Sequence, residues 1–282
     1  MKLTNYMSFM ADFYKNGLDW AVEHSVKMGF EAVEILVESL DDLPFSNPDA
    51  AMAARELLSA NGLSVSCYSV AADLTGENRE AVIEKMLDQV DIAAALGSPY
   101  LHHTLLPVIK LTDDSPKYEQ VLPLALDGAQ RIAEYAQSYG ITCLYEPQGM
   151  YFNGVEGLGR FYEEIKKRVP NVGVCGDTGN SMFVDVDPVD IFKAFSADIK
   201  HLHVKNYKFS DKDFCEPSAR KTKGGNYIAF AEVQDGWVRI EECFKAVKGY
   251  SGNISFEMAV NDDILLRASE YANSLAKKHF AI

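Results

Sequence analysis

The chain contains 282 residues, 48% of them hydrophobic, which is enough for a sizeable buried core in one large domain or two ordinary ones. Its 41 acidic residues outnumber the 27 basic ones, and the formal net charge is −14. Such a surface repels phosphate backbones and anionic lipid heads, so we expect no nucleic-acid partner and no membrane partner.

The cysteines and the first residues predict a reduced, cytoplasmic setting. The 5 cysteines are scattered and never stand at C-x-x-C spacing, which suggests neither a disulfide framework nor a zinc knuckle. Residues 1–6 lack a basic patch followed by an apolar core, so they do not resemble a signal peptide. No apolar run reaches the length of a membrane span.

Short apolar runs alternate with amphipathic stretches through the first half of the chain. In one stretch, Ile83, Met86 and Val90 recur on one helical face, and Gly97 ends it. The pattern predicts strands at 3–6, 32–36, 63–68 and 100–103, and helices at 18–28, 48–60, 78–96 and 116–139.

The second half repeats the alternation with one interruption. It predicts strands at 141–146, 171–177, 199–203 and 254–257, and helices at 158–169, 188–195, 239–247 and 264–275. A long loop is expected at 204–236. Loops of this length in a compact barrel are usually functional.

Eight strands alternating with eight helices predict a parallel sheet. Over this length the pattern favours a closed (β/α)₈ TIM barrel, and no G-x-G-x-x-G follows the first strand as a doubly wound dinucleotide fold would require. Because no linker divides the chain, we expect one domain over 1–282. The active site of such a barrel lies at the carboxyl ends of its strands.

Four consecutive predicted strands end on side chains able to bind a metal, namely Glu146, Asp177, His203 and Glu257. Neighbouring strands lie about 4.8 Å apart, so the four ends can converge on one ion. Three carboxylates and an imidazole form a mostly oxygen site. We therefore expect one divalent ion per chain, with Mn²⁺ favoured and Mg²⁺, Co²⁺ or Zn²⁺ as alternatives.

An ion at this position suits proton chemistry on a carbohydrate. It can hold a vicinal hydroxyl and carbonyl and polarise the carbonyl, which acidifies the neighbouring C–H. Two carboxylates on opposite sides of the substrate can then remove a proton from one face and return it to the other. The expected reaction is isomerisation or epimerisation through a metal-stabilised enediolate.

The motifs at these positions resemble the xylose-isomerase-like barrel superfamily, which includes ketose 3-epimerases, hydroxypyruvate isomerase and inosose dehydratase. They are Tyr145-Glu146-Pro147, Gly176-Asp177-Thr178-Gly179-Asn180, His201-Leu202-His203-Val204-Lys205-Asn206 and Ser255-Phe256-Glu257. The resemblance covers the whole chain. It implies that the four residues are metal ligands, that Glu146 and Glu257 are the acid/base pair, and that a homodimer or homotetramer is compatible with the family.

The resemblance also implies a substrate pocket. Glu34 and the His102/His103 pair are similar to pocket positions on strands two and four. Alternation lets only one histidine of the pair face inward, and His103 is the one expected there. Trp237 is a candidate for stacking on a sugar ring, with core packing as the alternative. His201 shares a strand face with His203, and we expect it to pack in the barrel core.

Three positions depart from the ketose 3-epimerase pattern. Asn180 stands where those enzymes carry a histidine, Phe209 lies near their arginine, and Phe152 lies near their glutamate. We keep Asn180 as a substrate-binding candidate, although a plain ketohexose fits these departures poorly.

Lys205 resembles the His-x-Lys of inosose-dehydratase-like members, where an ammonium steadies an enolate or protonates a leaving hydroxyl. It joins Glu146 and Glu257 as a catalytic candidate. A metal-dependent dehydratase and a non-catalytic carbohydrate-binding barrel are therefore the alternatives to an isomerase or epimerase. The segment 204–236 carries six basic residues, which indicate either a lid for an anionic substrate or a solvated surface; these are Lys205, Lys208, Lys212, Arg220, Lys221 and Lys223.

Overall fold

Parallel strands close into a barrel in the computed structural model, which describes residues 1–106 and 116–280. Around the barrel the strands follow the order β1-β11-β7-β6-β5-β4-β3-β2, and each neighbouring pair is parallel. This confirms the expected (β/α)₈ TIM barrel. The barrel strands are β1 (Leu3–Asn5), β2 (Ala32–Val37), β3 (Ser64–Val70), β4 (Tyr100–His103), β5 (Thr142–Tyr145), β6 (Val172–Asp177), β7 (Ile199–Val204) and β11 (Ile254–Phe256).

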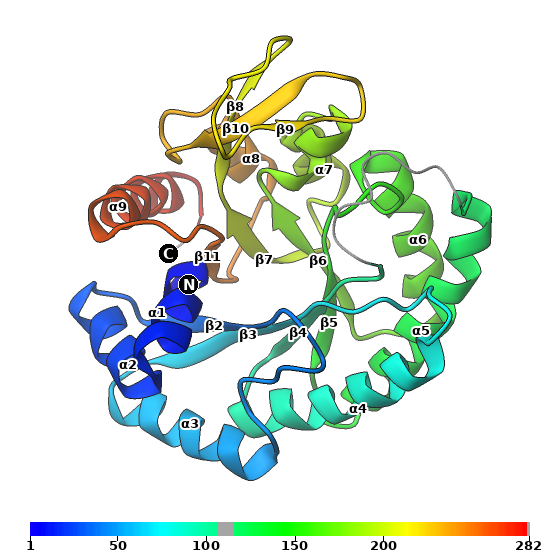
Figure 1. The fold of residues 1–282 in the computed structure, drawn as a ribbon, viewed down its shortest axis with the longest axis vertical. Helices are drawn as coiled ribbons and strands as arrows, with labels where there is room; N and C mark the ends of the chain where they lie inside the picture. The colour runs from blue at the N-terminus through cyan, green and yellow to red at the C-terminus, as the bar shows by residue number, and fades with distance from the viewer. Residues whose placement is uncertain (107–115, 281–282) are drawn as a thin grey trace.

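Helices surround the ring of strands (Figure 1). Within the described ranges, no helix is both long enough and apolar enough to cross a bilayer. The helices are α1 (Met7–Asn16), α2 (Leu18–Lys27), α3 (Pro48–Ala60), α4 (Arg79–Leu96), α5 (Tyr118–Gln137), α6 (Gly154–Arg168), the 3₁₀ helix η1 (Asn180–Val184), α7 (Pro188–Ala194), α8 (Ile240–Ala246) and α9 (Asp262–His279).

The first and last strands of the barrel, β1 and β11, pair where the barrel closes. Leu3 of β1 lies in register with Ile254 of β11, and β1 pairs with β2 on its other side. The imidazole of His24 on α2 reinforces the closure, with Nδ1 2.7 Å from Asp12 Oδ2 on α1 and Nε2 3.1 Å from Asp262 Oδ2 on α9.

Besides the short 3₁₀ helix η1, two elements were missing from the sequence prediction. The first is α1, which directly follows the 3-residue β1 and has no side-chain N-cap, although Phe9 and Met10 on it are buried. The second lies in the segment expected to be a loop, where three strands form a small antiparallel sheet in the order β8-β10-β9. They are β8 (Asn206–Ser210), β9 (Arg220–Lys221) and β10 (Tyr227–Ala231), and Figure 1 shows them outside the barrel near α7 and α8. Strands β8 and β9 contain mainly polar and basic residues, so they do not appear as apolar runs.

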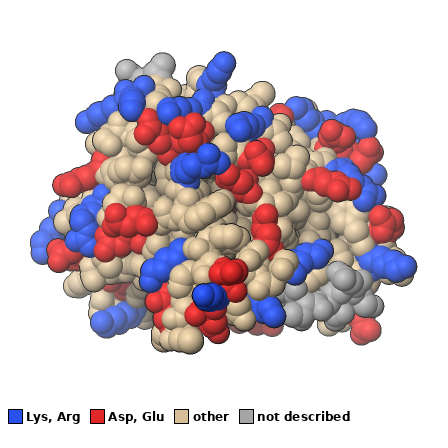
Figure 2. All heavy atoms as spheres, turned by 90° about the horizontal axis from the view of Figure 1, so that it is seen from above, with Lys and Arg blue, Asp and Glu red and all other residues tan. Residues whose placement is uncertain are grey.

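Charges of both signs are interspersed on the surface. Figure 2 shows Lys and Arg side chains among Asp and Glu side chains over the face that it presents. Several of these form ion pairs across elements, such as Arg267 on α9 with Glu232 at 2.8 Å. Pairs of this exposed kind contribute little to stability individually.

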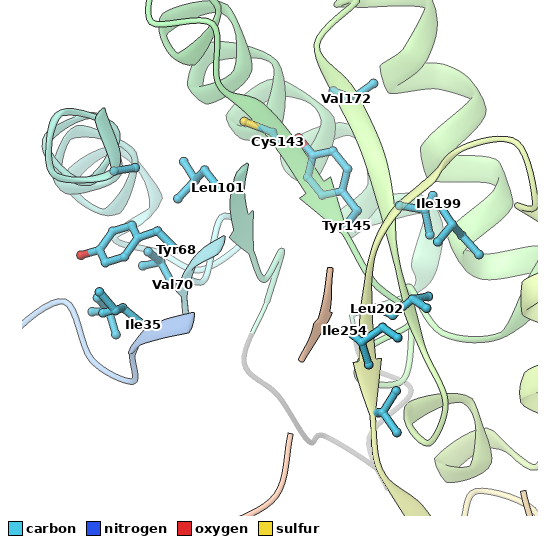
Figure 3. Packing of buried hydrophobic residues seen from close by; sticks show 14 of the residues in the cluster. Ile35, Tyr68, Val70, Leu101, Cys143, Tyr145, Val172, Ile199, Leu202 and Ile254 are labelled. Atoms are coloured by element: carbon cyan, nitrogen blue, oxygen red, sulfur yellow. The ribbon is translucent and has the colours of Figure 1, made fainter. Parts of the chain in front are cut away.

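The main apolar core lies between the strands and the helices. Tyr68 of β3 reaches α4, where its hydroxyl donates to Gln89 Oε1 at 2.7 Å, and the Tyr145 ring of β5 packs 4.9 Å from the Phe161 ring of α6. Figure 3 shows Tyr68 and Tyr145 among the residues of this core. A second, smaller cluster lies on the opposite strand face, inside the barrel, and consists of Cys67, Leu144 and Cys175.

Two glycines in α6 offer a matched test of how closely this helix approaches its neighbours in the chain. An added Cβ at Gly157 would lie 2.2 Å from the backbone oxygen of Tyr151, whereas at Gly159 it would find its nearest neighbour, in Phe195, at 3.9 Å. We expect Gly157→Ala to lower the free energy of unfolding by about 1–3 kcal/mol through overpacking. Gly159→Ala should leave it unchanged or raise it by up to about 1 kcal/mol, because alanine favours helix. Denaturant unfolding of both variants checks the pair; equal effects would contradict the packing.

Candidate metal centre and substrate pocket

Four side chains from neighbouring strands converge at one mouth of the barrel. Glu146 directly follows β5, Asp177 ends β6, His203 lies near the end of β7, and Glu257 directly follows β11. One ligand atom from each lies within 4.8 Å of the others. His203 Nδ1 is 3.2 Å from Glu146 Oε2 and 3.2 Å from Glu257 Oε2. The structure thus brings together the residues expected to bind a metal; binding itself stays a prediction.

The glycine turn after β6 fixes the orientation of the Asp177 carboxylate. Its Oδ1 accepts the backbone N–H groups of Gly179 at 2.8 Å and Asn180 at 2.5 Å. Its Oδ2 is buried without a hydrogen-bond partner among the described residues, although Lys205 lies close to it. One carboxylate oxygen therefore holds the turn while the other remains directed at the cluster.

Lys205 adds an ammonium group to the cluster. Nζ lies 2.7 Å from Glu257 Oε2 and 3.1 Å from Asp177 Oδ2, and the residue is buried. Burial lowers the pKa of Lys205, but Asp177 and Glu257 outweigh this and hold the pKa well above its ordinary value. Gly179 makes the approach feasible, since a Cβ there would lie 2.8 Å from Lys205 Cγ.

Ionised groups dominate the cluster. Burial tends to raise the pKa of Glu257, but Lys205 and His203 outweigh it and lower that pKa to about 2. Burial also tends to lower the pKa of His203, yet Cys175 and Glu34 lead the groups that hold it well above its usual value. Burial raises the pKa of Asp177 despite Lys205. Glu257 is therefore a carboxylate at neutral pH.

A fully buried polar layer lies next to the cluster, inside the barrel. Glu34 Oε1 is 2.9 Å from His203 Nε2, and Glu34 Oε2 is 2.9 Å from His201 Nε2. Burial tends to raise the pKa of Glu34, but the two histidines lower it well below its usual range. Glu34 was expected in the substrate pocket. The structure instead surrounds its carboxylate with protein groups, and His201 packs in the core as expected.

A pocket of about 320 Å³ opens beside the cluster. Glu146 and Glu257 form part of its wall. The residues lining it are Tyr6, Met7, Leu36, Glu38, Ser69, Val70, Ala71, His102, Thr104, Glu146, Gln148 and Glu257. A cavity of this size is typical of small-molecule sites.

The histidine that faces this pocket is His102, whereas His103 was expected there. His102 pairs in register with Ser69 on the inward face, and its Nε2 lies 3.5 Å from Glu146 Oε1. His103 turns to the other face, where its ring lies 5.2 Å from the Tyr145 ring. Strand alternation allows only one inward histidine, and the sequence did not identify which.

Two other pocket candidates lie elsewhere. Trp237 is 46% exposed, and its ring lies 5.2 Å from Phe209 on the small sheet. Asn180 begins η1, and its carbonyl accepts Asn153 Nδ2 at 2.8 Å. Neither is among the described residues that line the 320 Å³ pocket.

The basic residues of 204–236 lie in several places, and one of them, Lys223, lines a separate pocket of about 620 Å³ together with Lys117 and Arg160. Lys205 joins the cluster, whereas Lys208 pairs with Glu216 at 3.1 Å and Arg220 donates to the backbone oxygens of Pro217 and Ala219. Lys208 and Arg220 are absent from the described lining of the 320 Å³ pocket. The basic group nearest to the residues in that lining is the Lys205 ammonium, 2.7 Å from Glu257.

Sequence reasoning did not single out Tyr6 or Ser69. Tyr6 directly follows β1, and its ring lies 5.2 Å from the His203 ring. Ser69 bridges Glu34 and His102, with Oγ at 2.6 Å and 3.1 Å from them. Tyr6 could have been found by its position as the last residue of the strand predicted at 3–6; Ser69 carries no comparable signal, because serine is frequent on strands and loops alike.

The donor set fits a divalent cation. Three carboxylates and an imidazole suit a hard ion, and the buried oxygens Asp177 Oδ2 and Glu257 Oε2 already attract one cation, the Lys205 ammonium, at 3.1 Å and 2.7 Å. Such acceptors normally find a donor or a cation when removed from water. The fit supports the expected metal site without choosing among ions.

The chain belongs to the xylose isomerase-like TIM barrel family, because the family sequence model of that description matches residues 22–277. A search of curated protein sequences finds no significant match.

Several solved structures share the fold. The D-allulose 3-epimerase of Methylomonas sp. is 17% identical, with a TM-score of 0.74 over 98% of this chain and 98% of that one. The probable 3-DHS dehydratase AsbF of Bacillus anthracis is 17% identical, with a TM-score of 0.74 over 97% and 99%. A xylose isomerase-like TIM barrel protein from Mycobacterium smegmatis, solved in complex with magnesium, is 16% identical, with a TM-score of 0.70 over 99% and 98%.

Proposed function

We propose that the protein is a divalent-metal-dependent isomerase or epimerase acting on a carbohydrate or a related polyhydroxy carbonyl compound. The observation that carries this proposal is the convergence of Glu146, Asp177, His203 and Glu257 beside a pocket of about 320 Å³. A bound divalent ion would supply the polarisation that makes a C–H next to a carbonyl acidic. These four residues are the ones that would hold it.

The protein groups supply the proton transfers. Glu146 and Glu257 both line the pocket, so one carboxylate takes the proton from the substrate carbon and the other carboxyl returns one. Lys205 stabilises negative charge that develops on the substrate oxygen. The pKa of Glu257, lowered to about 2, leaves the group ionised at neutral pH, which is the form that can accept a proton.

The comparisons support carbohydrate chemistry on this scaffold. One similar structure is a D-allulose 3-epimerase, and another contains magnesium. Both support the proposal as members of the same fold with 17% and 16% identity.

A metal-dependent dehydratase is the second candidate, and Lys205 favours it. Its buried ammonium, 2.7 Å from Glu257, is placed to protonate a leaving hydroxyl once Glu257 has removed a proton. The similarity to a probable dehydratase at 17% identity is compatible with that reading.

One assay separates these functions. The protein, loaded with Mn²⁺ or Mg²⁺, is incubated with free and phosphorylated ketoses in deuterated water, and NMR follows loss of the proton next to the carbonyl. We expect deuterium uptake into a product of otherwise unchanged mass. A product lighter by one water would favour the dehydratase. Metal and sugar binding without deuterium uptake from any ketose would contradict both enzymes and leave a binding protein.

Metal removal provides an independent check. Chelator-treated protein should lose turnover and regain it with a divalent ion, and saturating metal should raise the melting temperature. At 100 times Kd the stabilisation is about 2.7 kcal/mol. Asp177→Asn should abolish the shift. Asp198→Asn, which removes a partly exposed carboxylate 2.5 Å from Lys166, should retain it. The same shift in both variants would exclude Asp177 as a ligand.

A further inference from the structure

The buried Glu34 carboxylate receives side-chain groups from three other strands. Its Oε1 lies 2.6 Å from Ser69 Oγ and 2.9 Å from His203 Nε2. Its Oε2 lies 2.5 Å from Ser255 Oγ and 2.9 Å from His201 Nε2. The Glu34 side chain has no exposed surface, so no solvent contact competes with these four.

The chemistry of a carboxylate sets the direction of all four bonds. An ionised carboxylate only accepts hydrogen bonds, so each hydroxyl and each imidazole nitrogen facing it must donate. The proton of His203 that faces Glu34 is therefore on Nε2. Nδ1, which lies 3.2 Å from both Glu146 and Glu257, is then the nitrogen left to coordinate a metal.

Through Ser69, the carboxylate of Glu34 also determines which nitrogen of a second histidine is protonated. A serine hydroxyl has one proton, and Ser69 donates it to Glu34 Oε1. Its contact with His102 Nδ1, at 3.1 Å, must then be a bond that it accepts, which places the His102 proton on Nδ1.

The other nitrogen of His102 is consequently an acceptor at the pocket wall. Nε2 is buried without a hydrogen-bond partner in the described chain, and it lies 3.5 Å from the acceptor Glu146 Oε1. Two neighbouring acceptors with no donor between them are unfavourable when buried. A hydroxyl bound in the pocket supplies the missing donor.

We propose that Glu34 is a positioning residue that fixes the protonation pattern of two imidazoles, so that His203 offers Nδ1 to the metal and His102 offers an unprotonated Nε2 to a substrate hydroxyl. The metal part rests on the proposed function. The His102 part requires only the hydrogen bonds of the metal-free protein.

Glutamine at position 34 tests this directly because it keeps the shape and changes the bonding. Its NH₂ group must replace one carboxylate oxygen and then faces two donors. At Oε1 it opposes Ser69 and His203; at Oε2 it opposes His201 and Ser255. The donors on that side must turn or exchange their protons.

The first measurement is metal affinity, by calorimetric titration of the whole chain with Zn²⁺ alone. Glu34→Gln should raise Kd about 10–100-fold, the usual effect of losing a carboxylate behind a histidine ligand. Glu31→Gln makes the same charge change at an exposed position just before β2, and its Kd should equal that of the unmodified protein. Equal Kd values for the three proteins would overturn the metal part.

The second measurement is the protonation of each ring nitrogen, read from long-range ¹H–¹⁵N spectra. The unmodified protein should show His102 protonated on Nδ1 alone and, with Zn²⁺ bound, His203 protonated on Nε2. Ser69→Ala should disturb the His102 pattern and leave the Zn²⁺ Kd within about 3-fold, which keeps the test decisive should Glu34→Gln fold poorly. His102 protonated on Nε2 in the unmodified protein would overturn the proposal.

The two proposals fail in different ways. If the unmodified protein binds no divalent ion, the proposed enzymatic function fails, and the His102 spectra still decide whether Glu34 and Ser69 set its protonation. If metal binds and substrate turns over while Glu34→Gln changes neither Kd nor the spectra, the positioning role fails and the enzymatic function stands.

Discussion

Glu257→Gln should leave the barrel folded and reduce turnover by at least about 10³-fold. The amide has nearly the same shape, but it cannot accept a proton from a substrate carbon, and general acid–base groups contribute typically 10²–10⁴-fold to rate. It is also a weaker ligand for a hard cation than a carboxylate. The Glu257 side chain is 24% exposed, and Lys205 retains Asp177 as a partner, so the fold should tolerate the change. Turnover with deuterium exchange, circular dichroism and melting temperature provide the readouts.

A matched control is available for this variant. Glu242 on α8 lies 2.7 Å from Lys245, the same distance that separates Glu257 from Lys205, but the pair is exposed. Glu242→Gln therefore removes an equivalent ion pair far from the pocket chemistry and should keep full turnover. Retention of deuterium exchange in Glu257→Gln would remove Glu257 from the acid–base pair.

Lys205→Met should separate catalysis from metal binding. Without the ammonium, developing negative charge on the substrate loses a buried cation, and we expect turnover to fall about 10²–10³-fold, as for other charge-stabilising groups. Metal affinity should rise, because the ammonium is 2.7 Å from Glu257 and 3.1 Å from Asp177 and repels a second cation at those oxygens. Calorimetric titration and steady-state kinetics measure the two effects.

Lys208→Met is the corresponding control. The Lys208 side chain is exposed and lies 3.1 Å from Glu216, so its removal should alter neither metal affinity nor turnover. Unchanged turnover in Lys205→Met would rule out the ammonium as a catalytic group and remove the main support for a dehydratase. Loss of metal in that variant would mean that Lys205 supports the site rather than competing with the ion.

The sequence predicts the barrel well because the spacing of apolar residues along the chain follows which side chains are buried. Strands such as Val172–Asp177 are uniformly buried and appear as apolar runs, and each helix carries one apolar face. The small sheet escaped prediction because β8 and β9 consist largely of polar and basic residues, and because no helix separates its three strands, so the β–α alternation does not reveal them. Helix α1 escaped because it follows β1 at once and lacks a side-chain cap.

The candidate site was predictable where chemistry coincides with a strand end. Glu146, Asp177 and Glu257 are polar groups closing apolar runs, and such residues are conspicuous in any sequence. Alternation alone could not choose between His102 and His103, since a strand of 4 residues leaves its face undetermined. The role of Glu34 depends on partners that no local pattern connects to it.

The same carboxylate has a consequence for how the chain folds. Its four partners lie 35, 167, 169 and 221 positions away in sequence. Until β11 docks, Glu34 lacks the Ser255 hydroxyl. A partly closed barrel that already removes the carboxylate from water then bears a desolvation cost that its hydrogen bonds do not fully compensate. Contacts of such long range form late in folding. Ring closure is thus expected to be all-or-none, with half-assembled barrels disfavoured by a single buried negative charge.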